Sequence, residues 1–134
     1  MNSKDIILSH IQEHKNVLDS IDHVMIKKIE DISEILIKTL SDGNTIFWCG
    51  NGGSAGDSQH LAAELIGRYK SDRRPLKSIA LTTDSSAITC ISNDYSYDKV
   101  FERQIEGLGV NGDVLIGIST SGNSLNIINA IKKC

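Results

Sequence analysis

The sequence predicts an α/β fold in which a parallel β-sheet lies between layers of helices. Three short apolar runs are predicted as strands, and each is followed by one or two stretches with helical periodicity. This alternation is typical of parallel β-α-β units. The run at 113–119 is continuously apolar, which predicts a strand covered on both faces. The predicted strands are 45–50, 77–82 and 113–119, and the predicted helices after them are 54–67, 85–92, 97–108 and 123–133.

The N-terminal segment precedes every predicted strand. Apolar side chains recur at every third or fourth position over 4–40, with one gap near His14, which predicts one short helix and then a longer one. Gly43 is a natural end for the second helix. A small domain offers these helices little sheet to cover, so we expect a partner subunit to cover their apolar stripe. We therefore divide the chain into helices for oligomer packing, 1–43, and an α/β domain, 44–134.

Composition limits the class of protein and of partner. The chain of 134 residues is long enough for one domain, and 40% hydrophobic with 23% charged residues is ordinary for a globular protein. A net charge of −3 gives no electrostatic basis for a nucleic-acid or membrane partner. Three cysteines without a Cys-x-x-Cys spacing favour reduced thiols in the cytoplasm. The one basic cluster favours a solvated loop over a phosphate contact; it consists of Arg68, Lys70, Arg73 and Arg74.

A glycine-rich turn, "CGNGGSAGDS", joins the first predicted strand to its helix. Ligands of parallel sheets bind at the carboxyl ends of strands, and a helix N-terminus favours anions. The spacing of Gly50, Gly52 and Gly56 is one residue too long for a dinucleotide fingerprint. A ligand site and tight packing of helix on strand both remain possible explanations of these glycines.

A second turn, "STSGNS" at 119–124, carries four hydroxyl groups between a predicted strand and a predicted helix. Hydroxyls and backbone amides at a helix N-terminus can hold a phosphate without a lysine. The alternative is simple N-capping of the helix, for which one hydroxyl suffices. Four hydroxyls therefore favour an anion site.

Two polar pairs lie close to these turns in the predicted fold. His60 and Glu64 are four residues apart on one helix face, where they can share a metal ion, divide acid–base work or simply form a surface pair. The helix begins at the glycine turn, which favours a functional pair. Asn93 and Asp94 are predicted to lie in a turn, where they either contact a ligand or only shape the turn.

Taken together, these motifs resemble one family. "CGNGGSAGDSQHLAAEL", "GRYK", "IALTTDSSAITCISND" and "GDVLIGISTSGNS" closely resemble the phosphoheptose isomerases of the sugar isomerase (SIS) superfamily. The resemblance implies a flavodoxin-like, five-stranded parallel sheet and a homotetramer packed through the N-terminal helices. It also implies a zinc site and conversion of sedoheptulose 7-phosphate to D-glycero-D-manno-heptose 7-phosphate, a step toward lipopolysaccharide or capsule.

The resemblance also assigns roles to individual residues. Glu64 matches the catalytic base, which moves a proton between C1 and C2 through an enediol, and His60 with Glu64 match metal ligands. The remaining matches are substrate contacts: Asn51, Gly52, Gly53, Asn93, Asp94, Ser119, Thr120, Ser121 and Ser124.

The chain departs from the family pattern in one respect. Family members continue past the position of Cys134 with two further strands and a helix, whose glutamine and histidine complete the metal site. The histidine also serves as general acid in the family. With two of the expected ligands, and zinc needing three or four, we expect the 134-residue chain alone to bind zinc poorly and to isomerise little.

Three functional hypotheses therefore stand beside one another. The first is the isomerase, or an inactive truncated copy of it. The second is a non-catalytic SIS-domain protein that binds another protein, and the third is a sugar-phosphate sensor without chemistry. Both turns and Glu64 match the isomerase pattern, which favours the first hypothesis.

Overall fold

The computed structural model describes residues 2–134, which separate into two compact units. The first unit extends to Ile35, and the second runs from Leu36 to Cys134. In the part of the chain that the structure describes, no helix is both long and apolar enough to cross a membrane.

Two long helices make up the N-terminal segment. Helix α1 (Ser3–Asp19) has 17 residues and helix α2 (His23–Ser41) has 19, so the prediction of two helices is confirmed, but the prediction that the first is short is wrong. Asn2 begins α1 with a capping box, in which its side chain accepts from the Asp5 amide at 2.9 Å. The gap in the apolar pattern near His14 does not interrupt α1, because that ring bonds the carbonyl of His10 one turn earlier at 2.8 Å.

The boundary between the units lies inside α2 rather than after it. All side chains of residues 2–35 are exposed, whereas Leu36 and Leu40 in the last turns of α2 are partly buried against the core of the second unit. The role of residues 1–43 in oligomer packing stays a prediction.

The second unit contains the predicted parallel sheet. Its strands are β1 (Ile46–Gly50), β2 (Ser78–Ala80) and β3 (Val114–Ile118), in the order β2-β1-β3. Both pairings are parallel, which confirms the predicted fold class. Strand β1 is central and fully buried, but β3 is only half-buried, because within the described chain it lies at the edge of the sheet.

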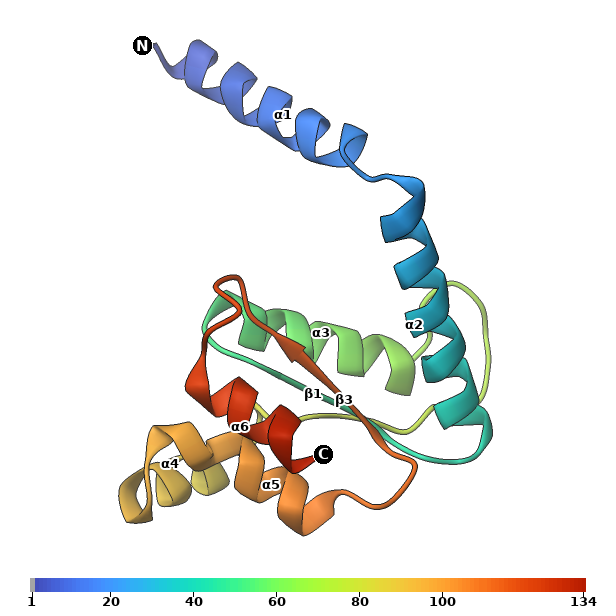
Figure 1. The fold of residues 1–134 in the computed structure, drawn as a ribbon, viewed down its shortest axis with the longest axis vertical. Coiled ribbons are helices and arrows are strands. Elements are labelled where there is room, and N and C mark those ends of the chain that lie inside the picture. Colours follow the sequence, from blue (N-terminus) through green and yellow to red (C-terminus); the bar gives the residue numbers. More distant parts are fainter. Residues whose placement is uncertain (1) are drawn as a thin grey trace. The chain divides into compact units, whose positions relative to one another are not determined.

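Helices cover both faces of this sheet (Figure 1). Ile46 and Trp48 of β1 face helix α3 (Gly53–Ile66), while Phe47 and Cys49 face α5 (Val100–Leu108) and α6 (Leu125–Lys133). This alternation follows from the two-residue period of a strand. The buried Trp48 donates its ring N–H to the Ser78 hydroxyl at 2.8 Å, so its one polar atom is satisfied.

The segment after β2 departs from the prediction. Helix α4 (Ser85–Asp94) begins at Asp84, whose carboxylate accepts from the Ala87 amide at 2.9 Å. The helix continues through Asn93 and Asp94, so these residues form its last turn rather than the predicted turn after it. A single 3₁₀ turn, η1 (Tyr97–Lys99), then leads into α5.

Candidate functional site

The glycine turn combines close packing with an open face. A Cβ atom at Gly50 would lie 2.6 Å from the Ser54 carbonyl carbon, so packing of α3 on β1 explains this glycine. Gly52 has φ +57° and ψ −120°, a conformation that requires glycine. Gly53 begins α3, and nothing lies within 4 Å of a Cβ added there or at Gly56. The turn therefore leaves the N-terminus of α3 accessible to a ligand.

Asn51 connects this turn to a distant part of the chain. Its side-chain amide pairs reciprocally with that of Asn126 in α6, at 3.0 Å in one direction and 2.8 Å in the other. The Asn51 Oδ1 atom also accepts from the Tyr97 hydroxyl at 2.9 Å. These bonds hold the glycine turn beside the first turn of α6, the helix that follows the serine-rich turn.

The serine-rich turn gathers its hydroxyl groups at the start of α6. The Ser119 hydroxyl lies 3.2 Å from that of Ser124 and 3.4 Å from that of Ser121. It also accepts from the Gly122 amide at 3.1 Å. Ser124 occupies the N-cap position, but its hydroxyl makes no capping bond. N-capping therefore does not explain these hydroxyls, whose convergence at a helix N-terminus suits an anion.

His60 and Glu64 lie on the outer face of α3. Their side chains approach to 3.7 Å, between Nε2 and Oε1, with the His60 side chain 73% and the Glu64 side chain 34% exposed. No third metal-ligating side chain joins them among residues 2–134. Two donors alone do not fit a zinc ion, which is held in proteins by three or four ligands.

The carboxyl end of α3 is fixed by a residue that the sequence analysis placed in a solvated loop. The Arg73 guanidinium donates to the carbonyl of Glu64 at 2.7 Å and to that of Leu65 at 2.8 Å. These carbonyls have no partner within the helix, so Arg73 caps it and anchors the turn that carries Glu64. The prediction of a solvated basic loop is therefore wrong for Arg73.

Asn93 and Asp94 bond to their own neighbourhood rather than to the two turns. Asn93 donates to the Asp94 carboxylate at 2.9 Å, and the Cys90 thiol lies 3.4 Å from the same group. These two hydrogen bonds, that of Asn93 first, lower the pKa of Asp94. The carboxylate in turn raises the pKa of the Cys90 thiol. Asp94 is thus held as an exposed anion at the end of α4.

A family model and several curated proteins match this chain. The model of the SIS domain matches residues 9–134. The phosphoheptose isomerase of Aliarcobacter butzleri is 55% identical over 129 residues, which cover 96% of this chain and 68% of that protein. The chain belongs to the phosphoheptose isomerase family of SIS-domain proteins.

Other family members agree in sequence and in structure. The phosphoheptose isomerase of Helicobacter pylori is 50% identical over 129 residues, covering 96% of this chain and 67% of that protein. The solved phosphoheptose isomerase of Neisseria gonorrhoeae superposes with a TM-score of 0.91 at 41% identity and covers 98% of this chain and 68% of that one. That of Francisella tularensis gives a TM-score of 0.94 at 32% identity, covering 99% and 70%.

The chain is shorter than the family members that it matches. It spans from 55% to 68% of the length of curated phosphoheptose isomerases such as those of Akkermansia muciniphila and Aliarcobacter butzleri. The glycine turn and the serine turn both carry residues that the motif resemblance assigns to the family's site. The structure brings these two turns to one edge of the sheet. It places Glu64 on the helix that starts at the glycine turn.

Sequence reasoning missed Asn126 and Tyr97. Asn126 is only 3% exposed and precedes the fully buried Ala130 by one helical turn, so it lies on the apolar face of α6. A polar side chain at a core-facing position was the available signal, because such a group needs a buried partner. Tyr97 gave no comparable signal, since it is half exposed in a short 3₁₀ turn.

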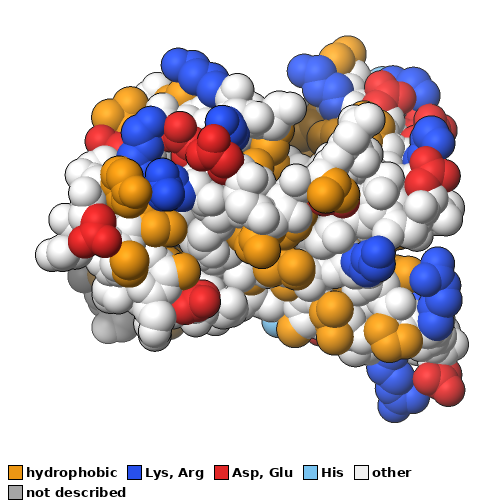
Figure 2. Space-filling view, turned by 90° about the horizontal axis from the view of Figure 1, so that it is seen from below, with side chains coloured by type: hydrophobic (Ala, Val, Ile, Leu, Met, Phe, Trp, Pro, Cys, Tyr) orange, Lys and Arg blue, Asp and Glu red, His pale blue; other side chains and the backbone are white. Residues whose placement is uncertain are grey.

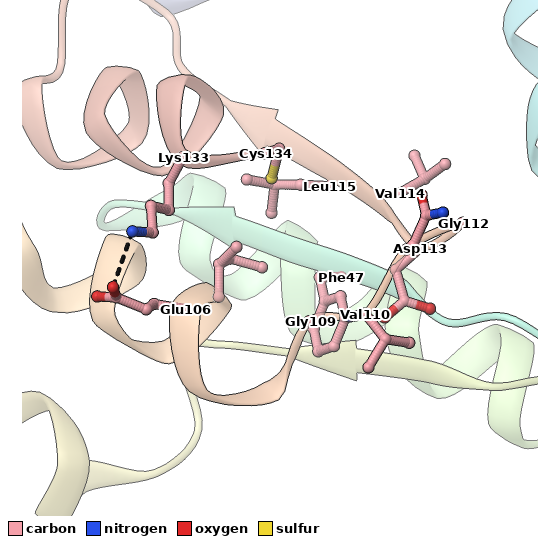
Figure 3. A pocket seen from close by; sticks show the side chains of 12 residues that line it. Phe47, Glu106, Gly109, Val110, Gly112, Asp113, Val114, Leu115, Lys133 and Cys134 are labelled. Atoms are coloured by element: carbon pink, nitrogen blue, oxygen red, sulfur yellow. Dashed lines mark hydrogen bonds and ion pairs between the residues drawn. The ribbon is translucent and has the colours of Figure 1, made fainter.

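A pocket of about 330 Å³ lies at the other end of the strands (Figure 3). Phe47 and Leu115, near the start of β1 and β3, form part of its wall. At its rim Lys133 is paired with Glu106 at 2.8 Å, which lowers the pKa of Glu106 and raises that of Lys133. None of the predicted site residues lines this pocket, so it is separate from the family's site.

Proposed function

We propose that this protein acts in the isomerisation of sedoheptulose 7-phosphate to D-glycero-D-manno-heptose 7-phosphate. The observation that carries the proposal is the Asn51–Asn126 pair, which holds the glycine turn and the start of α6 together. The proposed anion-binding loop is thereby brought to the start of α3, the helix whose last turn carries Glu64. The names of the relatives, which are phosphoheptose isomerases, support a heptose phosphate as substrate, and the motif resemblance suggests sedoheptulose 7-phosphate in particular.

The phosphate group is proposed to bind at the serine turn. The hydroxyls of Ser121 and Ser124 lie 3.4 Å and 3.2 Å from that of Ser119, and α6 adds the positive end of its dipole. Thr120 lies in the same turn and is exposed. Binding energy from the phosphate would then position the reacting carbons, which lie at the other end of the sugar.

The sugar is proposed to extend from the serine turn toward the glycine turn. Gly52 and Gly53 present backbone amides at the N-terminus of α3, where the first amides of a helix lack partners within the helix. Asn51 belongs to the same contact region. Asn93 and Asp94 complete the proposed set of polar contacts, with Asp94 as a hydrogen-bond acceptor for sugar hydroxyls.

Glu64 is proposed as the base that moves the proton. Its carboxylate takes a proton from C1 of the ketose while the C2 carbonyl oxygen gains one, which gives a 1,2-enediol. The protonated carboxyl group, once it has exchanged with solvent, delivers a proton to C2 while the C1 hydroxyl releases its own, which balances the proton gained at the C2 oxygen and leaves a C1 aldehyde. A half-exposed carboxylate on a helix anchored by Arg73 suits this role, because it reaches solvent yet has a fixed backbone.

His60 and Glu64 are proposed as two ligands of a zinc ion, as in the family pattern. When bound, such an ion would polarise the substrate carbonyl. The two donors described do not make a complete zinc site, and no step above depends on the metal. We expect weak zinc binding by the 134-residue chain alone.

A second candidate function is binding of a sugar phosphate without turnover. The convergence of the Ser119, Ser121 and Ser124 hydroxyls at the start of α6 favours it, because binding needs only the two turns. The two candidates differ in one measurable property, which is whether bound substrate exchanges its C1 proton.

The assembly is proposed to be a homotetramer in the cytoplasm. Apolar side chains stand among charged ones on the surface in Figure 2, and those of α1 are all exposed. Exposed apolar side chains along a helix are typical of a helix that another protein subunit covers.

The three cysteines are free thiols, which fits a reducing compartment. The product would feed heptose synthesis for lipopolysaccharide or capsule.

The test combines binding and proton exchange on the 134-residue chain. Titration calorimetry measures sedoheptulose 7-phosphate binding, and NMR in D₂O follows loss of the C1 proton signal, with and without zinc. The parent chain is expected to bind and to exchange slowly; Glu64→Gln is expected to keep binding within about twofold and to abolish that slow exchange, since the amide is no base. Asp57→Asn, a matched change on the same helix, is expected to preserve both.

The outcomes separate the hypotheses. Exchange that needs Glu64 supports the isomerase. Binding without exchange, even when zinc is present, supports the second candidate. A chain that binds neither sedoheptulose 7-phosphate nor inorganic phosphate overturns both.

A further inference from the structure

Asn126 places a buried amide group beside the proposed site. The residue is 3% exposed, within a helix face that otherwise buries Ile127 and Ala130. Burying an amide is unfavourable unless its hydrogen bonds are made. Its Oδ1 accepts from the Asn51 side chain and from the Ile127 amide, both at 3.0 Å, and its Nδ2 donates to Asn51. Among residues 2–134, Asn51 is thus the one side chain that this buried group binds.

The Asn51 side chain is almost fully occupied within the protein. A carbonyl oxygen has two lone pairs, and those of Oδ1 are taken by Asn126 at 2.8 Å and by the Tyr97 hydroxyl at 2.9 Å. One Nδ2 proton is donated to Asn126, which leaves a single proton free. The backbone carbonyl of Asn51 accepts from the Ser54 amide at 3.0 Å. Asn51 therefore has little left to offer a substrate.

Its neighbours in the turn are placed by these bonds. Gly52 and Gly53 follow Asn51 directly and have no side chain of their own to fix them. Glycine backbones are conformationally permissive, so their amides need an external anchor to keep one direction. On the helix side the Gly52 carbonyl accepts from the Ala55 and Gly56 amides, and on the strand side the anchor is Asn51, held from α6 and from η1.

We propose that Asn126 and Tyr97 are positioning residues that, through Asn51, aim the Gly52 and Gly53 amides at a sugar phosphate. The inference rests on the proposed function, because it assumes that these amides face the substrate. Helix α6 carries both Asn126 and the serine turn that precedes it, so the same helix sets the distance between the phosphate end and the sugar end of the site. The contribution of Asn51 to substrate binding is then through its backbone neighbours rather than its side chain.

Tyr97→Phe is the gentlest test, because it removes one hydroxyl from a half-exposed ring. We expect affinity for sedoheptulose 7-phosphate to fall about fivefold, the typical effect of one neutral hydrogen bond, with unfolding temperature unchanged. Affinity for inorganic phosphate, which binds at the serine turn alone, should stay the same. Tyr95→Phe is the matched control, since that exposed ring stacks on Arg103 and makes no bond to Asn51.

Asn126→Ala removes both bonds of the amide pair and should weaken sugar-phosphate binding at least about tenfold. Asn129→Ala is its control, because Asn129 lies one turn further along α6 and donates to the Asp98 carbonyl at 3.1 Å without reaching Asn51. Both controls should bind within about twofold of the parent chain. Amide ¹H–¹⁵N NMR of the 134-residue chain gives a second readout: Gly52 and Gly53 should shift in both test variants and in neither control.

The two readouts keep the inference distinct from the proposed function. If the parent chain binds no sugar phosphate, the proposed function fails, while the amide shifts still report whether Asn126 and Tyr97 set the glycine turn. Unchanged Gly52 and Gly53 signals in Tyr97→Phe overturn the positioning role. Equal losses of phosphate and sugar-phosphate affinity in Tyr97→Phe also overturn it, because they indicate general loosening of the site. Should Asn126→Ala fail to fold, Tyr97→Phe decides alone.

Discussion

The two turns of the proposed site, after β1 and after β3, are built by opposite means. The turn after β1 is built from glycine backbone, packed against Ser54 at Gly50 and anchored by buried amides through Asn51. The turn after β3 is built from exposed side-chain hydroxyls that bond to one another. One edge of a parallel sheet can therefore present hydrogen-bond donors either from a rigid backbone or from adaptable side chains. We expect the glycine turn and the serine turn to respond differently to substitution.

The largest expected effect is at Gly50. An alanine Cβ would lie 2.6 Å from the Ser54 carbonyl carbon and 2.8 Å from its Cβ, so strand and helix must separate. We expect Gly50→Ala to lower the free energy of unfolding by about 3 kcal/mol, the upper end for an overpacked contact. Urea unfolding followed by tryptophan fluorescence measures this change, since Trp48 lies two residues away in β1.

Gly56→Ala is the matched control on the same turn. An added Cβ there meets nothing within 4 Å, and alanine is favoured over glycine inside a helix by about 0.5–1 kcal/mol. The variant should be as stable as the parent or slightly more so. Equal destabilisation by both substitutions would contradict the packing explanation for Gly50.

The next effect compares the positive-φ glycines of the two turns. Gly52→Ala should cost about 2 kcal/mol, because φ +57° with ψ −120° is a conformation that only glycine adopts readily. Gly122, with φ +67°, lies in the exposed turn and should cost about 1 kcal/mol when replaced by alanine. Thermal unfolding of both variants measures the difference. A larger loss at Gly122 would mean that the serine turn is the more rigid of the two.

A smaller effect is expected from the hydroxyl cluster. Ser119→Ala removes the acceptor of the Gly122 amide at 3.1 Å, on a partly exposed residue, so the loss of stability should be at most about 1 kcal/mol. Thr120→Ala is the control for stability, because the Thr120 hydroxyl makes no hydrogen bond among the described residues and is exposed. Affinity for inorganic phosphate, measured by calorimetry, should nevertheless fall in Ser119→Ala. If Thr120→Ala lost as much stability and as much phosphate affinity as Ser119→Ala, this explanation of the serine turn would be wrong.

The sequence predicted those elements whose signals are local. Strands β1 and β3 and helix α3 were predictable because apolar runs and glycine or serine turns are local signals. The end of α4 was not, because Asn93 and Asp94 resemble turn residues locally while the helix continues through them. The shorter first helix was predicted from a gap in an apolar stripe, although a polar residue such as His14 leaves the backbone helical.

Long-range hydrogen bonds account for the rest of what was missed. Asn51 and Asn126 are separated by 75 positions, and no spacing rule connects them. Arg73 stands in a run of basic residues, and only the fold shows that it caps α3 rather than facing solvent. The partner of a polar residue can be found only from the structure when it lies in another element. A pair at local spacing, such as His60 with Glu64, can be recognised from the sequence.

The smallest perturbation uses Cys49 as a native reporter of the rigid turn. Burial, and secondarily the nearby Cys134 thiol, raises the pKa of Cys49 to about 12. Because only the thiolate reacts and it forms only as pH rises toward the pKa, roughly one part in ten thousand is ionised at pH 8. Iodoacetamide at pH 8 should therefore label the exposed Cys90 in the native chain long before Cys49, as peptide mass spectrometry can show. Gly50→Ala should speed labelling of Cys49 and leave that of Cys90 unchanged, whereas Ser119→Ala should change neither. Rapid labelling of Cys49 in the parent chain would show that the glycine turn opens in solution. A rigid backbone would then not be what distinguishes the glycine turn from the serine turn.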